Sequence, residues 1–232
     1  MGRWVTGRAI AMTEDVDIAT FERLAMVIQD EASPALPDAL KLLGLEPVPG
    51  LKPAEGGARW RMKGGGASLD FLTPSVDEAE SVRPLPALGV TAQSLHFLNY
   101  LIADPIPAVA LYRNGVLVKV PQPARFAIHK LIVAQRRSGP NRNKARKDIA
   151  QAKALIEVLV DDRPGDLARA YDEAVERGPK WRSALDASVR RHADLAAWIG
   201  EISRSQHDRL HHEAGSGQFA GHDRHADPSC RT

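Results

Sequence analysis

The chain of 232 residues carries a net charge of +2 with 44% hydrophobic and 26% charged residues, which is typical of a globular protein with one large or two small domains. No run approaches the roughly 20 apolar residues of a membrane span and no signal-peptide pattern opens the chain, so we expect a cytoplasmic protein without a membrane partner. The only cysteine, Cys230, excludes an internal disulfide and a thiolate metal cluster.

The first predicted element is a strand with the sequence EDVDIATF, residues 14–21. Acidic residues are depleted in strands, yet Asp15 and Asp17 stand one residue apart in this one. Residues at i and i+2 of a strand point to the same face, about 6 to 7 Å apart. Such a pair either lies on an exposed edge, where it discourages aggregation, or binds a cation that relieves the repulsion.

Helical segments and a glycine-rich hairpin follow this strand. Residues 21–44 predict one or two helices, broken near Pro34 and Pro37 and ended by a glycine. Two strand-like runs then flank KGGG, residues 63–66, and predict a hairpin because glycine readily adopts the positive φ of tight turns. The second of these runs, ASLDFLTP, contains another aspartate, Asp70.

A second hairpin is predicted at PAVALYRNGVLVKVP, residues 107–121. Its Asn114-Gly115 dipeptide is a strong signal for a tight turn. The four hairpin strands and the preceding helix outline a mixed sheet. The fold class of this half is therefore α/β or α+β.

After Pro123 the pattern changes from strands to helices. Apolar residues recur at spacings of three and four in residues 124–137 and 143–160, and Pro140 marks the loop between them. A third helix is predicted at residues 165–177, capped by Asp166 or Gly165, and a fourth at residues 179–200. This order predicts an α/β domain over residues 1–123 and a helical domain over residues 124–202.

The remaining residues, 203–232, are rich in Gly, His, Asp and Ser and predict a disordered tail. His207, His211 and His212 have spacings that could ligate a metal on a helix. Because no carboxylate partner accompanies them, a solvated run is the simpler interpretation.

Charge is distributed unevenly along the chain. Residues 13–46 hold eight acidic and two basic side chains, whereas Arg125 to Lys147 holds eight Lys or Arg and no acid. If the two segments meet, one could hold cations and the other anions, as a metal-bound polyphosphate requires. The alternatives are a solvated basic helix face and nucleic-acid binding with a steep salt dependence. With 5% aromatic residues and no evident stacking platform, recognition of single strands is not expected.

The aspartates suggest a metal site if their strands pair. Asp15, Asp17 and Asp70 would then converge and could hold two Mg²⁺ or Mn²⁺ ions about 4 Å apart, an arrangement suited to in-line phosphoryl displacement. Hard divalent cations of this kind prefer carboxylate oxygens together with substrate phosphates.

Four segments together resemble a bacterial family of nucleotidyltransferase-fold proteins, distantly similar to minimal nucleotidyltransferases and AbiEii-type toxins. They are TEDVDIA, LDFLTP, VPQPARFAIHKLIVAQRR and KARKDIAQA. The resemblance covers roughly residues 8–185, and RFAIHKL followed by RR and K-x-x-K-D is its most specific part. It implies a mixed nucleotidyltransferase-like sheet with helices, followed by a C-terminal helical bundle.

The resemblance also implies roles for individual residues. Asp15 and Asp17 correspond to the acidic pair that binds the divalent ions bridging a nucleoside triphosphate. Asp70 matches the third acid, which helps to activate the incoming hydroxyl. Lys130 resembles a lysine that contacts the triphosphate, and Asp148 resembles the aspartate of the last motif.

The local chemistry of the predicted helices agrees with these roles. Lys130 and Arg137 lie seven residues apart on one side of their helix and could both meet phosphate oxygens. Alternatively, Lys130 only extends from an apolar face into solvent. For Asp148 the simpler interpretation is a pairing with Arg136 or Arg137 that joins two helices and orients the phosphate-binding side chains.

One departure from the family pattern concerns the N-terminus. The family carries a strand, a Gly-Gly or Gly-Ser turn and a helix before the acidic pair, and MGRWVTGRAIAM is too short for them, so we expect a chain that lacks this motif. The leading hypothesis is a protein that binds a nucleoside triphosphate with Mg²⁺ and transfers a nucleotidyl group to a hydroxyl of a protein, an RNA end or a small molecule. The alternative is a non-catalytic interaction protein of the same fold, such as one component of a toxin-antitoxin pair.

Overall fold

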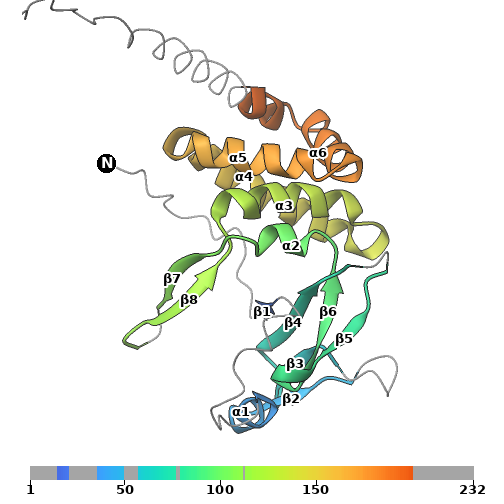
Figure 1. Ribbon diagram of the computed structural model, residues 1–232, viewed down its shortest axis with the longest axis vertical. Helices are drawn as coiled ribbons and strands as arrows, with labels where there is room; N and C mark the ends of the chain where they lie inside the picture. The colour runs from blue at the N-terminus through green and yellow to red at the C-terminus, as the bar shows by residue number, and fades with distance from the viewer. Residues whose placement is uncertain (1–14, 21–35, 50–56, 77–78, 112, 201–232) are drawn as a thin grey trace, which may run out of the picture.

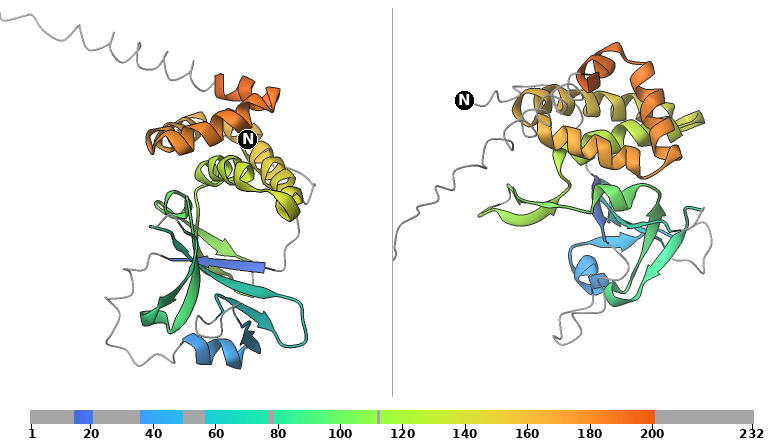
Figure 2. Two further views of the ribbon diagram at one scale, coloured as in Figure 1. Left: turned by 90° about the vertical axis from the view of Figure 1, so that its right-hand side faces the viewer. Right: turned by 45° about the horizontal axis from the view of Figure 1, so that its top comes forward.

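The computed structural model describes residues 15–20, 36–49, 57–76, 79–111 and 113–200. A sheet lies at one end of this part of the chain and a layer of helices at the other (Figures 1 and 2). The helix expected at residues 21–35, the histidines of the tail and the expected disorder of residues 203–232 lie outside the described residues.

A six-stranded mixed sheet forms the strand-rich end. Its main path has the order β2-β3-β4-β6-β5, and β1 pairs with β4 outside this path. The β1–β4 and β4–β6 pairings are parallel and the others antiparallel. The strands are β1 (Asp15–Ala19), β2 (Leu45–Pro47), β3 (Arg59–Met62), β4 (Ser68–Pro74), β5 (Val82–Leu85) and β6 (Val90–Leu95). Because β4 pairs with three of the other strands, it is the centre of the sheet.

The glycine-rich hairpin is confirmed. β3 and β4 pair in antiparallel register through Arg59–Asp70, Trp60–Leu69 and Arg61–Ser68. Gly64, Gly65 and Gly66 in the turn have φ values of 90°, 95° and 95°, which residues with a Cβ rarely adopt.

The second predicted hairpin forms, but it does not join the mixed sheet as expected. β7 (Ile106–Ala110) and β8 (Val116–Val120) make a separate two-stranded sheet. Six of their ten residues are exposed, and neither strand pairs with a strand of the main sheet. The turn also differs from a two-residue Asn-Gly turn, because the strands end at Ala110 and begin again at Val116, with positive φ at Arg113 and Gly115.

The helices of the second half agree closely with the sequence periodicity. The α-helices are α1 (Leu36–Leu42), α2 (Leu98–Leu101), α3 (Pro123–Arg136), α4 (Arg142–Asp162), α5 (Pro164–Glu176) and α6 (Pro179–Arg190), and the short 3₁₀ turns are η3 (Pro86–Leu88) and η4 (Gly139–Asn141). Residues 193–200 are helical again, so the helix expected over residues 179–200 is interrupted at residues 191–192. Within the described part of the chain, no helix is both long and apolar enough to cross a membrane.

Proline, not a capping side chain, marks three of the helix starts. Pro123, Pro164 and Pro179 each occupy the first helical position, where the missing N–H costs no hydrogen bond. The prediction that Asp166 or Gly165 caps α5 was therefore wrong, because the helix begins one residue earlier and its N-cap residue is Arg163.

Two hydrophobic cores stabilise the molecule. One lies among the helices and includes Ile128, Ile132, Ile156 and Leu167. The other lies against the sheet, and its members are Leu40, Trp60, Leu69, Phe71, Leu85, Val90 and Ala92. Tyr100 of α2 belongs to the helical core although it precedes residue 123, so α2 attaches the strand-rich half to the helices. The domain boundary at residue 123 stays a prediction.

Candidate functional site

The parallel pairing of β1 with β4 brings two of the predicted acidic residues together. Asp17 is the register partner of Asp70, and Asp15 is the partner of Ser68. Register partners on neighbouring strands have their side chains on the same face, and neighbouring strands lie about 4.8 Å apart. Asp17 and Asp70 also line the same cavity of about 550 Å³. The side chain of Asp15 lies outside the described residues, so convergence of all three carboxylates stays a prediction.

Asp70 is held by an arginine that the sequence analysis did not single out. Arg59 Nε donates a hydrogen bond to Asp70 Oδ1 at 2.6 Å, and Arg59 Nη2 donates to Oδ2 at 2.5 Å. This bidentate geometry fixes the orientation of the carboxylate. The signal was present in the hairpin, because the KGGG turn makes Arg59 and Asp70 register partners.

On α3, the two predicted cations share one buried carboxylate. Lys130 Nζ lies 2.8 Å from Asp148 Oδ1, and Arg137 Nε lies 2.9 Å from Asp148 Oδ2. Asp148 is 3% exposed, whereas the side chains of Lys130 and Arg137 are 21% and 29% exposed. The structure therefore shows that Asp148 pairs with side chains of the α3 region and so joins α3 to α4. Of Arg136 and Arg137, its partner is Arg137.

Arg136 has a different role from that of Arg137. Its Nη1 donates a hydrogen bond to Glu80 Oε1 at 2.9 Å, and the same carboxylate oxygen accepts the backbone N–H of His96 at 3.0 Å. This interaction ties α3 to the segments that flank β5 and β6. The sequence analysis did not predict that Arg136 pairs with Glu80, because the two residues are 56 positions apart and leave no local signal.

Acidic and basic residues line one groove. A cavity of about 390 Å³ is lined by Asp17 from β1 and by Lys130 and Arg137 from the α3 region. The cavity of about 550 Å³ adjoins it, since Asp17, Leu72, Leu95 and Arg137 line both. We call the two together the central groove. Asp148 lines neither cavity, so its contribution to the groove is to hold Lys130 and Arg137 in place.

His129 is a further polar group of the central groove. It lines the 390 Å³ cavity, and among the described residues its buried Nδ1 has no hydrogen-bond partner. Burial and the neighbouring charge of Lys130 lower the pKa of His129 to about 4, outweighing the opposite effect of Asp148. The imidazole is therefore neutral at pH 7 and can donate or accept a hydrogen bond.

The lowered pKa of His129 predicts a pH-dependent stability. Between about pH 6.5 and pH 4 the unfolded chain binds a proton that the folded chain does not, so the free energy of unfolding falls as the pH falls through this window. We expect a loss of about 2 kcal/mol between pH 7.5 and pH 5.0 from this group. Guanidinium unfolding at both pH values should show the loss in the wild type and largely remove it in His129→Gln.

His192→Gln is the matched control for this measurement. The pKa of His192 is also lowered by burial, but His192 stands outside the groove, at the interruption after α6. We expect this variant to retain most of the wild-type pH dependence. Equal pH dependence in His129→Gln and the wild type would show that His129 is not the titrating group.

The residues of the central groove fit a divalent cation with a polyphosphate. Asp17 and Asp70 supply hard carboxylate oxygens, and Lys130 and Arg137 supply positive charge in the same groove. No group of three His, Cys, Asp or Glu side chains gathers among the residues described, so a metal held here would take further oxygens from Asp15, water or the bound substrate.

Comparison with known proteins agrees with the sequence resemblance. A family model described as nucleotidyltransferase matches residues 3–176, which include the sheet, α3, α4 and α5. Neither the curated proteins nor the solved structures contain a match. The mixed sheet with its covering helices is consistent with this family, and the match spans well over half of the chain. The chain therefore belongs to the nucleotidyltransferase family.

Proposed function

We propose that the chain binds a nucleoside triphosphate with Mg²⁺ in the central groove and transfers the nucleotidyl group to a hydroxyl. The observation that carries the proposal is that Asp17 and Asp70 line adjoining cavities together with Lys130 and Arg137. An array of this kind binds a substrate that presents phosphate oxygens to the cations and a metal ion to the carboxylates.

In the proposed reaction, the acceptor hydroxyl attacks the α-phosphorus and its proton passes to Asp70. The bond between the α-phosphorus and its bridging oxygen breaks, and pyrophosphate leaves. Arg59 holds the Asp70 carboxylate toward the groove, while Lys130 and Arg137 bind the oxygens that become pyrophosphate. Asp17 and Asp70, with Asp15 as predicted, would hold the metal ion, which would supply positive charge for the triphosphate. Mn²⁺ would serve the same site as Mg²⁺.

The position of the transferred label tests this proposal. The full chain is incubated with Mg²⁺ and each nucleoside triphosphate, labelled at either the α- or the γ-phosphate, together with protein, RNA and small-molecule acceptors. We expect transfer of the α label and release of the γ label as pyrophosphate. Transfer of the γ label would indicate a phosphotransferase, and an absence of Mg²⁺-dependent binding of every triphosphate would exclude the proposal.

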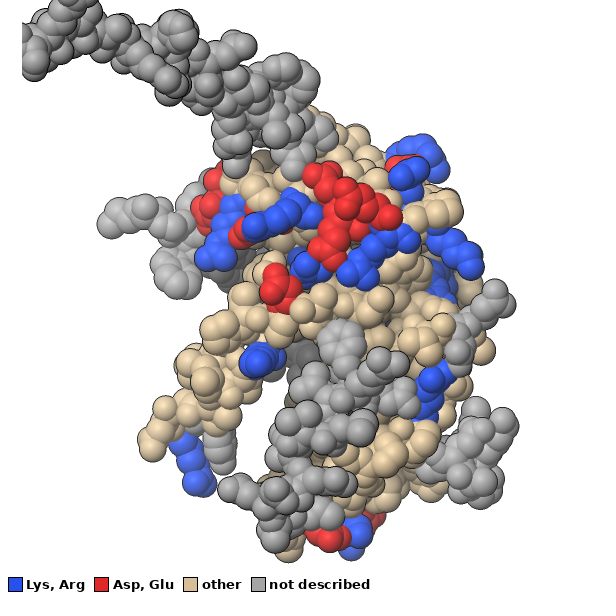
Figure 3. Space-filling model, viewed as in Figure 1, with Lys and Arg blue, Asp and Glu red and all other residues tan. Residues whose placement is uncertain are grey.

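The β7–β8 ribbon supports a second candidate function, that of a non-catalytic interaction protein such as one component of a toxin-antitoxin pair. The ribbon exposes Val109, Leu111, Val116 and Leu117, with exposed fractions between 48% and 98%. Figure 3 shows that charged side chains gather over the helical part of this face, whereas the ribbon carries few. Apolar side chains on a projecting ribbon suit a protein partner. Label transfer to any acceptor would show that the protein is not a non-catalytic interaction protein.

A further inference from the structure

A third cavity, of about 690 Å³, lies beside the central groove. It is formed by α2 and the residue before it, by the end of α3, and by the junction of α5 with α6. Three of its lining side chains, Arg136, Arg177 and Lys180, are positively charged, and none of the described residues that line it carries a carboxylate. We call it the side cavity. Its charge favours an anionic ligand.

Aromatic rings form part of its wall. Phe97 and Trp181 both line the side cavity, with ring centroids 4.5 Å apart and planes inclined at 78°. Tyr100 supports them from the helical core, with its ring 5.4 Å from that of Trp181. Phe97 and Trp181 lie far apart in the sequence, which is why a stacking platform was not expected from the sequence alone. Aromatic rings beside cations are the combination that binds bases and phosphates of single strands.

The two arginines of the cavity are held in place. The guanidinium carbon of Arg136 lies 5.3 Å from the Phe97 ring centroid, and that of Arg177 lies 5.4 Å from the Trp181 centroid. Each also has a carboxylate partner outside the cavity lining, Glu80 for Arg136 and Glu173 for Arg177. Guanidinium groups fixed in this way lose little conformational entropy when they bind phosphate.

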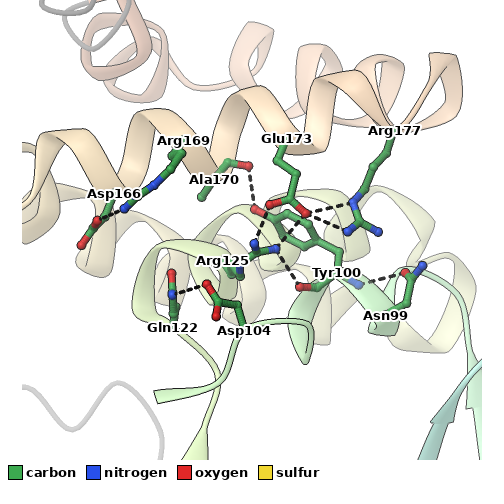
Figure 4. Close-up of polar contacts among 10 residues, drawn as sticks. All are labelled: Asn99, Tyr100, Asp104, Gln122, Arg125, Asp166, Arg169, Ala170, Glu173 and Arg177. Carbon is green, nitrogen blue, oxygen red and sulfur yellow. Dashed lines mark hydrogen bonds and ion pairs between the residues drawn. The ribbon is translucent and has the colours of Figure 1, made fainter. Parts of the chain in front are cut away.

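Glu173 connects the side cavity to a partly buried polar network. Figure 4 shows its carboxylate between Arg125 and Arg177, beside Tyr100, at Arg–O distances of 2.5 and 2.7 Å. Burial favours a raised pKa for Glu173, but hydrogen bonds from the two arginines outweigh it and lower the pKa below the usual value. The carboxylate therefore stays charged at neutral pH and keeps Arg177 at the cavity wall.

The side cavity adjoins the central groove. His96 and Arg136 line both the side cavity and the 390 Å³ cavity that contains Asp17. Phe97, at this junction, has a φ of 65°, a left-handed conformation that is uncommon for a bulky residue and that clusters at ligand sites. A ligand bound in the side cavity could therefore extend toward Asp17 and Asp70.

We propose that the side cavity binds the terminal nucleotides of a single-stranded polynucleotide, RNA or DNA. Its bases contact Phe97 and Trp181, and its phosphates contact Arg136, Arg177 and Lys180. An acidic peptide would meet the cations equally well but would leave the aromatic wall without planar partners. The binding of a single strand does not depend on the proposed function. The further step, that the bound strand is the acceptor of nucleotidyl transfer, rests on the proposed function.

Fluorescence anisotropy with labelled 12-nucleotide RNA and DNA of one mixed sequence tests the inference on the full chain. We expect wild-type binding of at least one of the two, and the comparison identifies which. Lys180→Glu should weaken binding by at least about fivefold and reduce the slope of log K against log salt by about 1. Lys63→Glu, a charge reversal in the turn between β3 and β4, should bind as the wild type does.

Each alternative outcome has a defined meaning. The inference is overturned if neither oligonucleotide binds, if Lys180→Glu binds as tightly as the wild type, or if Lys63→Glu weakens binding equally. If an oligonucleotide binds but nucleotidyl label passes only to polypeptides, the bound strand is not the acceptor of the transfer. Oligonucleotide binding without any Mg²⁺-dependent triphosphate binding would support the side cavity while removing the proposed function. Thermal unfolding midpoints show whether both variants are folded.

Discussion

Replacement of Asp17 by asparagine should weaken Mg²⁺-dependent binding of a nucleoside triphosphate by at least about 100-fold, because a metal ligand contributes more than the outer-shell groups whose loss costs 10- to 100-fold. Asn keeps the size of Asp and its place in β1 but removes the negative charge. Asp17 lines both cavities of the central groove, so the proposed metal ion and the proposed triphosphate would both lie beside it. Filter binding of labelled triphosphate at fixed Mg²⁺, with and without chelator, measures the effect.

Asp162→Asn is the control for this variant. Asp162 is exposed at the end of α4, where loss of an acidic charge does not weaken the helix. It should bind the triphosphate as the wild type does. If Asp17→Asn retains the wild-type Mg²⁺-dependent affinity, Asp17 is not a metal ligand and the proposed chemistry has no centre.

Replacement of Asp148 by alanine should lower the free energy of unfolding by about 3 kcal/mol. The change leaves Lys130 and Arg137 without the carboxylate that binds both at 2.8 and 2.9 Å. Breaking a buried pair costs about 3 to 5 kcal/mol. We expect the lower end of this range because the side chains of Lys130 and Arg137 are still 21% and 29% exposed. Urea unfolding measures the change.

Asp38→Ala provides the comparison, because its ion pair with Lys41 has side chains that are 65% and 61% exposed. Exposed pairs contribute less than about 1 kcal/mol, so this variant should remain close to the wild type. A double-mutant cycle with Lys130→Ala isolates the Lys130–Asp148 interaction. Additive effects in that cycle would contradict a direct coupling between the two side chains.

The helical half was largely predictable because its signals are local. Periodic apolar residues fill positions three and four apart, and Ala152, Ile156 and Leu159 of α4 are buried as this pattern requires. The hairpin turn at residues 63–66 was equally predictable, since its glycines adopt the positive φ values that the turn requires. The strands β2 and β5 were missed because they have only three and four residues, and β6 was missed because η3 and Gly89, not a glycine-rich run, connect it to β5.

The site was predictable in its residue types but not in its contacts. Asp17 and Asp70 stand out because acids are unfavourable in strands, and their adjacency required only that the two strands pair. The bond from Arg59 to Asp70 follows from the hairpin register. The pairing of Arg136 with Glu80 does not, because the two residues belong to segments that meet only in the folded chain.

By itself, the sequence determined the helices after residue 123, the glycine hairpin and the acidic and basic residues available for chemistry, since each depends on neighbours within a few positions. The tertiary structure decided that Asp148 holds Lys130 and Arg137 rather than lining the groove, that the β7–β8 ribbon remains separate, and that Phe97 and Trp181 form one wall. These features depend on the packing of whole elements against one another, and short-range sequence patterns do not specify which elements come into contact.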